Sequence, residues 1–224
     1  MAGKNYRLCC MVSVILLGLV APSTWAVNSI DQIITGLHQR YKSPGGLVIS
    51  YSREVKTRTM SMLGNKVKGD IASGQIYVLP PNLLRVEQQK PRKETLLTDG
   101  KSLWWIIPEE KKVYQYSSDQ FGKELQIITD LWEAPSRLKK QFDITLLNTD
   151  QQGRYVLEMV PGSTIEQASK IRIHVSRDYS LNLLEMINPV GTTTIFYFHS
   201  IRPEHLAKES FGFTIPEGFT VVHE

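Results

Sequence analysis

Residues 73–87 read SGQIYVLPPNLLRVE, and residues 98–116 read TDGKSLWWIIPEEKKVYQY. Apolar or aromatic side chains alternate with polar ones in short runs, and Pro80-Pro81, Asp99-Gly100 and Pro108 interrupt these runs. Alternation with a period of two, broken by Pro and Gly turns, is typical of β-strands joined in hairpins. The two stretches therefore predict strands over residues 74–79, 83–88, 103–107 and 111–116.

One helix and two further strands are expected before these stretches. Apolar residues recur three and four positions apart over residues 29–41, which is the spacing of one helical face. Asn28 or Ser29 can cap this helix, and Pro44-Gly45-Gly46 ends it. Strands are expected over residues 47–53 and 55–63.

The rest of the chain is expected to return to strands after a helical insertion. Residues 118–132 place apolar side chains at helical spacing, Pro135 interrupts the pattern, and residues 136–141 can add a further helical turn. The later strands are expected over residues 143–148, 155–160, 171–176, 181–188, 192–201 and 219–222. This order implies an α+β fold, in which one strongly curved antiparallel sheet has helices packed on one side.

The N-terminus predicts export from the cytoplasm. Lys4 and Arg7 precede an apolar run over residues 9–20, and small residues follow up to Ala26. This pattern is typical of a secretory signal peptide, which is too short and wrongly flanked for a stable membrane span. We expect cleavage after Ala26, which would separate a signal peptide, residues 1–26, from a single domain, residues 27–224. A retained N-terminal anchor is the alternative.

Cleavage would also remove both cysteines. Cys9 and Cys10 stand at the start of the apolar run, whereas a lipoprotein signal has its lipidated cysteine at the end. The mature chain would therefore be unlipidated and without disulfides, although an exported protein can form them. Its formal charge would fall from +4 to +2, because Lys4 and Arg7 leave with the signal. A nearly balanced charge argues against nucleic acid as the partner, since phosphate binding needs a concentrated basic face.

The sequence carries no motif of an enzyme or of a metal site. It has five histidines, no two of which have the spacing of a helical metal site, and no cysteine after Cys10. Nucleophile elbows, Walker loops and dinucleotide-binding glycine motifs do not occur. We therefore expect no enzyme activity, no metal and no cofactor. The tyrosines and tryptophans in the strands either line a ligand cavity or fill an ordinary core.

Three motifs, in order along the chain, resemble the LolA-type carriers of bacterial outer-membrane lipoproteins. Residues 74–87 hold a Gly-x-hydrophobic-aromatic strand, a Pro-centred bend and a second strand. Residues 99–104 read DGKSLW and are followed by a further aromatic residue and a proline. Residues 211–222 read FGFTIPEGFTVV and are similar to the ending of the family. The resemblance covers nearly the whole of residues 27–224.

The resemblance implies a fold, a function and partners. The fold would be an incomplete, unclosed β-barrel with helices as a lid on its concave side. The function would be that of a periplasmic chaperone, which binds the acyl chains of lipoproteins in a hydrophobic cavity and carries them from the inner to the outer membrane. The partners would be these acyl chains, an inner-membrane lipoprotein-releasing ABC transporter and an outer-membrane lipoprotein receptor. The protein itself is expected to be a monomer.

The expected site residues are of two kinds. The cavity residues are expected to be Leu84, Val86, Trp104, Ile106 and Tyr77. The lid residues are expected to be Ile127, Ile128, Leu131 and Trp132. Alternation puts Trp104 and Ile106 on one face of their strand and Trp105 on the other, and we favour Trp104 beside Leu84 and Val86.

One departure from the family concerns the lid. Many members carry an Arg immediately before the Pro-Asn-Leu bend, where it helps to hold the lid closed, and this chain has Pro80 at that position. The nearest cation is Arg85, so the latch of the lid cannot be carried over. Two other functions fit the same residues: a carrier or sensor of another lipid or glycolipid on the same half-barrel, and a secreted protein with a packed core and no ligand.

Overall fold

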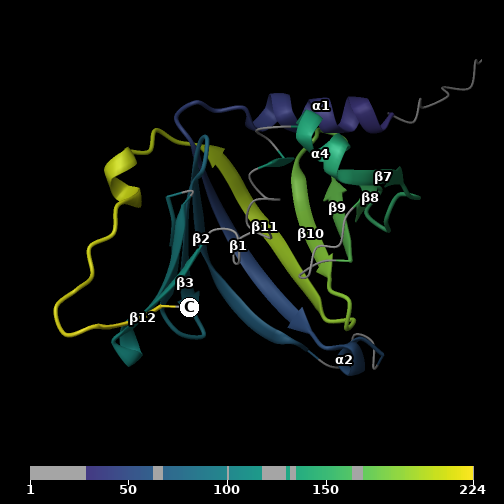
Figure 1. The fold of residues 1–224 in the computed structure, drawn as a ribbon. Coiled ribbons are helices and arrows are strands. Elements are labelled where there is room, and N and C mark those ends of the chain that lie inside the picture. Colours follow the sequence, from purple (N-terminus) through teal and green to yellow (C-terminus); the bar gives the residue numbers. More distant parts are fainter. Residues whose placement is uncertain are drawn as a thin grey trace, which may run out of the picture.

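The computed structural model describes residues 29–62, 68–99, 101–117, 130–131, 135–162 and 169–223 (Figure 1). The strands are β1 Leu47–Lys56, β2 Asp70–Leu79, β3 Leu83–Lys90, β4 Glu94–Thr98, β5 Ser102–Ile107, β6 Lys112–Ser117, β7 Phe142–Leu146, β8 Tyr155–Pro161, β9 Lys170–Val175, β10 Leu181–Ile187, β11 Thr193–Pro203 and β12 Thr220–His223. The helices are α1 Ile30–Tyr41, α2 Arg58–Met62 and α4 Pro135–Gln141, and the 3-10 turns are η2 Pro108–Glu110 and η3 Lys208–Phe211.

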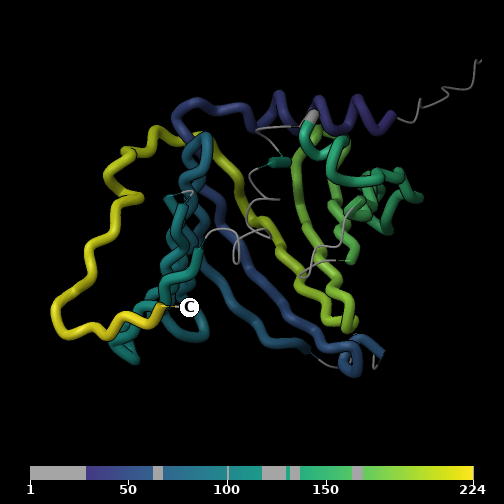
Figure 2. The backbone as a smooth tube through the Cα atoms, in the orientation of Figure 1, coloured from purple at the N-terminus to yellow at the C-terminus, as the bar shows by residue number. Residues whose placement is uncertain are grey.

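The strands form a single sheet that does not close. Their order is β12-β6-β5-β4-β3-β2-β1-β11-β10-β9-β8-β7, so β12 and β7 are its two edges. Neighbouring strands pair antiparallel, except that β12 and β6 pair in parallel. Figures 1 and 2 show the sheet strongly bent about the long strands β1 and β11. The predicted α+β fold with a strongly curved, unclosed sheet is confirmed.

Helix α1 lies where the sequence predicts it. The Ser29 hydroxyl accepts a hydrogen bond from Gln32 N at 3.2 Å, and the Gln32 side chain accepts one from Ser29 N at 2.8 Å. This capping box satisfies two amide groups that would otherwise lack partners at the helix start. The helical turn predicted near residues 136–141 is confirmed as α4, and Lys139 of α4 forms an ion pair with Asp31 of α1.

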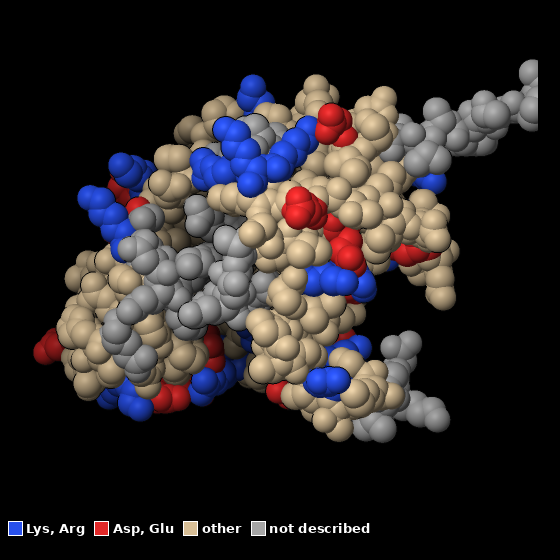
Figure 3. All heavy atoms as spheres, turned by 45° about the vertical axis from the view of Figure 1, so that its right-hand side comes forward, with Lys and Arg blue, Asp and Glu red and all other residues tan. Residues whose placement is uncertain are grey.

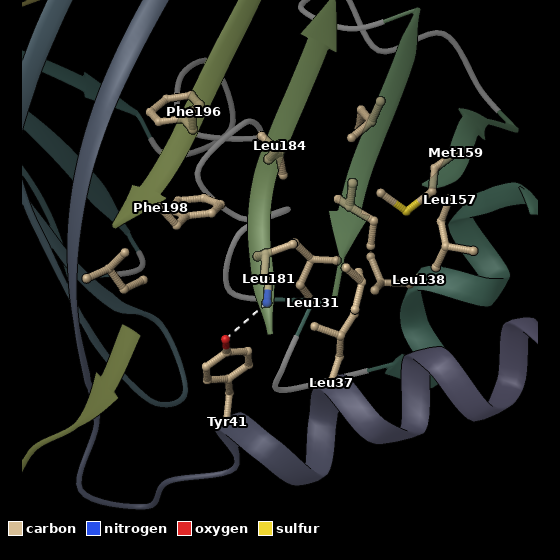
Figure 4. Packing of buried hydrophobic residues seen from close by; sticks show 14 of the residues in the cluster. Leu37, Tyr41, Leu131, Leu138, Leu157, Met159, Leu181, Leu184, Phe196 and Phe198 are labelled. Atoms are coloured by element: carbon tan, nitrogen blue, oxygen red, sulfur yellow. Dashed lines mark hydrogen bonds between the residues drawn. The ribbon is translucent and has the colours of Figure 1, made fainter. Parts of the chain in front are cut away.

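The main core lies between these helices and one face of the sheet, which we call the inner face. On β1 this face carries Leu47, Ile49 and Tyr51, and the opposite side of the sheet is the outer face. Figure 4 shows side chains of α1 and α4 pointing toward those of β8 and β10. The labelled residues are Leu37, Tyr41, Leu131, Leu138, Leu157, Met159, Leu181, Leu184, Phe196 and Phe198. Packing across this layer supplies the main apolar burial of the fold.

Two close contacts set how α1 sits on the sheet. Leu181 N donates a hydrogen bond to the Tyr41 hydroxyl at 3.1 Å, in a buried setting (Figure 4). A Cβ atom at Gly36 would lie 2.4 Å from ring atoms of Tyr179, which no side chain tolerates. The helix therefore approaches the sheet closely because residue 36 is glycine, and the Tyr41 hydroxyl satisfies an amide at the start of β10.

Two predicted features of the strands need correction. The strand expected over residues 55–63 is wrong, because β1 continues to Lys56 and α2 follows. The Thr57 hydroxyl accepts a hydrogen bond from Met60 N at 3.3 Å, which caps this short helix. Strand β4 was not predicted, since the basic stretch before it masks its alternation, but it pairs with both β3 and β5.

The segment after β11, residues 204–219, crosses the outer face, and we call it the C-terminal strap. Figure 2 shows it in yellow beside the half of the sheet that holds β3. Arg85 Nη1 donates to Ser210 O at 2.8 Å, Phe211 is buried, and the rings of Trp104 and Phe213 have centroids 6.2 Å apart. The strap therefore covers apolar outer-face residues before β12 joins the sheet edge.

The outer face of β8–β10 carries a network of charges instead. The Asp150 carboxylate lies 2.8 Å from His174 Nδ1 and 2.6 Å from Arg154 Nε. Arg172 Nε donates to Glu158 at 2.8 Å on the neighbouring strand. Burial by itself would raise the pKa of Asp150, but the hydrogen bonds from His174 and Arg154 outweigh it and hold this pKa well below its ordinary value.

Charged groups of both signs also share the surface drawn in Figure 3, where Lys and Arg side chains gather near the upper edge. Helix α4 supplies three exposed cations, which are Arg137, Lys139 and Lys140. Two of them are paired, Lys139 with Asp31 and Arg137 with Asp130. Local pairing of this kind reduces the field that a basic patch presents to solvent.

Replacing Tyr41 by Phe should lower the free energy of unfolding by about 1–2 kcal/mol, because Leu181 N loses its acceptor while buried. Chemical denaturation monitored by circular dichroism measures this loss. Tyr197→Phe is the matched control, since it removes a longer and half-buried hydrogen bond of 3.4 Å to Glu54. Equal losses in the two variants would contradict the role given to Tyr41.

Replacing Asp150 by Asn should lower the free energy of unfolding at pH 7 by about 2 kcal/mol, because charge-assisted hydrogen bonds are lost. A carboxyl whose folded pKa is depressed stabilises the fold above its unfolded pKa of about 3.9, and this contribution disappears as the pH falls further. The difference between variant and wild type should therefore shrink below about pH 4. Thermal unfolding at pH 7 and pH 3, with exposed Asp143→Asn as control, tests this, and an undiminished difference at pH 3 would refute it.

Candidate functional site

The inner face of β1, β2 and β3 is a continuous apolar surface. Residues directly opposite each other on antiparallel strands share a face, so the strand register shows which side chains lie together. Two apolar levels cross these three strands, Leu47–Val78–Leu84 and Ile49–Ile76–Val86. All six residues are buried and belong to the main core.

Aromatic side chains extend this surface onto β11. Phe198 lies level with Tyr51, and the centroids of the Tyr51 and Phe196 rings are 5.8 Å apart. The rings of Phe196 and Phe198 are stacked, with centroids 6.4 Å apart. Beyond them, β10, β9 and β8 continue the face with Leu184, Ile173 and Leu157 at one level. The inner face therefore stays apolar across most of the sheet.

The predicted cavity residues do not all lie on one face. Leu84 stands level with Thr98 and Leu103, and Val86 with Leu96 and Trp105, so Leu84, Val86 and Trp105 share the inner face. Tyr77 stands level with Arg85, Leu97 and Trp104, and Ile106 with Thr95, which places Tyr77, Trp104 and Ile106 on the outer face. The expected grouping of Trp104 with Leu84 and Val86 is therefore wrong, and Trp105 takes that place.

The three outer-face residues have other contacts. Trp104 packs against Phe213 of the C-terminal strap, and Ile106 stands opposite Val113 of β6. The Tyr77 hydroxyl donates to Gln75 Oε1 at 2.6 Å, and burial together with the Glu87 charge raises the pKa of Tyr77. These contacts hold the outer layer together, and none of them faces the inner apolar surface.

The predicted lid is described only in part. Ile127, Ile128 and Trp132 lie outside the described residues. Leu131 is helical, buried, and part of the main core beside α1 and α4. Next to it, Asp130 is only 4 % exposed, and its carboxylate lies 2.9 Å from Arg137 Nη1 of α4. Burial raises the pKa of Asp130, and the charge of Arg137 acts in the opposite direction.

The residues around the family's latch position point away from the inner surface. Pro80 lies in the turn between β2 and β3. Arg85, the nearest cation, lies on the outer face, where it donates to Ser210 O and pairs with Glu87 at 2.7 Å. Arg85 therefore ties down the C-terminal strap and is not placed to reach α1, whereas the Asp130–Arg137 pair joins residues 130–131 to α4.

A polar group on the inner face was missed by reasoning from the sequence. Arg53 of β1 and Gln88 of β3 interact there, with 3.4 Å between Arg53 Nη2 and Gln88 Oε1. On β4, Glu94 accepts a hydrogen bond from Trp105 Nε1 at 3.0 Å and also pairs with Arg92. Strand alternation could have placed Arg53 on the face of Tyr51, but its contact with Gln88 depends on the pairing of distant strands.

Two structural findings apply to the described ranges only. They contain no group of three or more His, Asp or Glu side chains arranged to hold a metal ion. They also contain no helix of the length and apolar character needed to cross a membrane.

Several known proteins are similar to this chain. Its residues 60–214 match the model of a family described as outer membrane lipoprotein carrier protein LolA. An outer-membrane lipoprotein carrier protein of Azotobacter vinelandii is 25% identical over 215 residues, which cover 94% of this chain and 98% of the relative. The carrier protein of Glaesserella parasuis is 24% identical over 190 residues, covering 84% and 83% of the two chains.

Solved structures share the fold at lower identity. An uncharacterized conserved protein from Thermus thermophilus superposes with a TM-score of 0.54 and 12% identity, covering 88% of this chain and 100% of the other. A LolA superfamily protein from Nitrosomonas europaea has a TM-score of 0.46 and 12% identity, covering 84% and 99%. The family model spans more than half of the sequence, and the chain therefore belongs to the LolA family of outer membrane lipoprotein carrier proteins.

Proposed function

We propose that this protein binds the acyl chains of lipoproteins on the inner face of its sheet and carries them from the inner to the outer membrane. The observation that carries the proposal is the continuous apolar inner face, from Leu84 and Val86 through Tyr51 to Leu157, in a member of a lipoprotein carrier family. A soluble protein has no need of so extended an apolar surface on a sheet that stays open at both edges, unless something apolar covers it.

Hydrocarbon chains suit such a surface. Each methylene group removed from water is worth about 0.8 kcal/mol, so a diacylated lipoprotein cannot cross an aqueous compartment unshielded. Leu, Ile, Val and Phe side chains shield acyl chains without directional contacts, which lets one site accept cargo whose only common part is hydrocarbon. The protein recognises the anchor and leaves the rest of each lipoprotein in solvent.

Release requires that the empty state compete with the loaded one. We assign the lid to Ile127, Ile128, Leu131 and Trp132, which would cover the inner face when no acyl chain is present. A lid and a ligand that compete for the same surface make affinity depend on lid stability. The buried Leu131 and the Asp130–Arg137 pair support this role, because they join one end of the lid to α4.

The same proposal assigns a route and a compartment. Residues 1–26 would be a signal peptide cleaved after Ala26, and residues 27–224 would act as a monomer in the periplasm. The donor would be an inner-membrane lipoprotein-releasing ABC transporter, and the acceptor an outer-membrane lipoprotein receptor. The protein would act as a chaperone without enzyme activity, cofactor or nucleic-acid partner.

Adjacent tryptophans on opposite faces give a matched test. The secreted protein is added to inner-membrane vesicles that contain the releasing transporter, a lipoprotein and ATP, and soluble lipoprotein bound to it is measured. Trp105→Glu should reduce the yield at least about tenfold, because a charge on the inner face opposes acyl burial. Trp104→Glu should release lipoprotein nearly as well as wild type, since its side chain lies under the C-terminal strap.

Thermal unfolding of both variants verifies that they are folded. Absence of release by the wild-type protein would refute the carrier function. Equal release by the two tryptophan variants would refute the placement of the acyl chains on the inner face. Mass spectrometry of lipid that copurifies with the wild type identifies a carrier or sensor of another lipid.

A further inference from the structure

One cation stands among the apolar residues of the inner face. Arg53 of β1 is level with Ala72 of β2 and Phe196 of β11, and both of these neighbours are buried. Gly74 lies two positions along β2 from Ala72, on the same face. Because β2 has only small side chains here, the long Arg53 side chain can cross it and reach Gln88 on β3.

Gln88 is built into the sheet to receive this cation. It is only 8 % exposed, and it stands level with Gly74 of β2 and Glu94 of β4. Its Nε2 donates to Arg92 O at 3.1 Å, which leaves its Oε1 directed to Arg53 Nη2 at 3.4 Å. The backbone of the β3–β4 turn therefore orients the amide, and the amide orients the guanidinium.

The guanidinium of Arg53 is poorly satisfied. Its Nε is buried and, in the described part of the chain, has no hydrogen-bond partner. No ion pair joins Arg53 to a carboxylate of those residues, and Glu94 on the same face is taken by Arg92 and by Trp105 Nε1. A partly buried charge without an anion is costly, and a buried N–H without an acceptor adds to that cost. An anion from outside the chain would remove both costs.

We propose that Arg53, oriented by Gln88, binds the anionic head group of an acylated ligand whose hydrocarbon lies on the inner face beside Tyr51 and Phe196. The planar guanidinium offers paired N–H groups that match the oxygens of a carboxylate or a phosphate. The inference rests on the proposed function in that both place acyl chains on this face. It goes further because it gives the ligand a charge, which the apolar surface alone does not require.

Binding of small acylated probes tests the proposal on the full secreted protein. The probes are palmitate, palmitoyl lysophosphatidate and the neutral methyl ester of palmitate, each titrated below the concentration at which it forms micelles. Wild type should bind at least one anionic probe about tenfold or more tightly than the ester, and the favoured anion distinguishes carboxylate from phosphate. Arg53→Gln should remove this preference and leave affinity for the ester unchanged.

Controls separate charge recognition from general damage. Arg53→Lys should keep part of the preference, because it keeps the charge but loses the fork of N–H groups. Arg85→Gln is the matched control, since Arg85 also has a buried unpartnered Nε but lies on the outer face. If Arg53→Gln does not fold, Gln88→Leu should weaken the preference several-fold by removing the group that orients Arg53.

The outcomes distinguish this inference from the carrier function. A wild-type protein that binds ester and anions equally, or an Arg53→Gln variant that loses both alike, overturns the inference while acyl binding stands. A preference for anions in a protein that releases no lipoprotein supports the inference and refutes lipoprotein carriage. Binding of no probe at all overturns the inference together with the apolar site on which it rests.

Discussion

The sheet is apolar on its inner face and does not close, so other parts of the chain have to keep water away from that face. A closed barrel hides its interior by pairing the first strand with the last, but here β12 and β7 remain apart. Helix α1, Leu131 and α4 cover the side formed by β7–β11. The close contact of Gly36 with Tyr179 and the Tyr41–Leu181 hydrogen bond hold α1 in place. An unclosed sheet whose cover consists of separate elements is well suited to exchange part of that cover for a ligand.

The outer face solves the same problem in a permanent way. The C-terminal strap packs Phe211 and Phe213 over the β3–β6 half, and Arg85 fixes it through Ser210 O. On the β8–β10 half, charged pairs around Asp150, Arg172 and Glu158 replace apolar packing. The two faces thus differ in kind: the outer one is closed by its own chain or by ion pairs, whereas the inner one keeps a long apolar surface with a single polar interruption at Arg53 and Gln88 among the residues described.

Much of the fold follows from local patterns. The capping box at Ser29, the apolar stripe of α1, the turn at Pro80-Pro81 and most strands are encoded by residues close in sequence, and the structure confirms them. Residues 55–63 are an exception, because their alternation resembles a strand although Thr57 caps a helix. Strand β4 is another, because it is short and gains its stability from two neighbours and not from its own pattern.

The sequence by itself determined the α+β class, the helix and strands, the resemblance to lipoprotein carriers, and the fact that Trp104 and Trp105 point to opposite sides of one strand. Only the tertiary structure decided which of the two faces the helices, because that depends on the register of β3, β4 and β5 with strands far away in sequence. The contact of Arg53 with Gln88 has the same origin, since it joins residues 35 positions apart across an intervening strand. Alternation is a local property of a strand, whereas the identity of the inner face is a property of the assembled sheet.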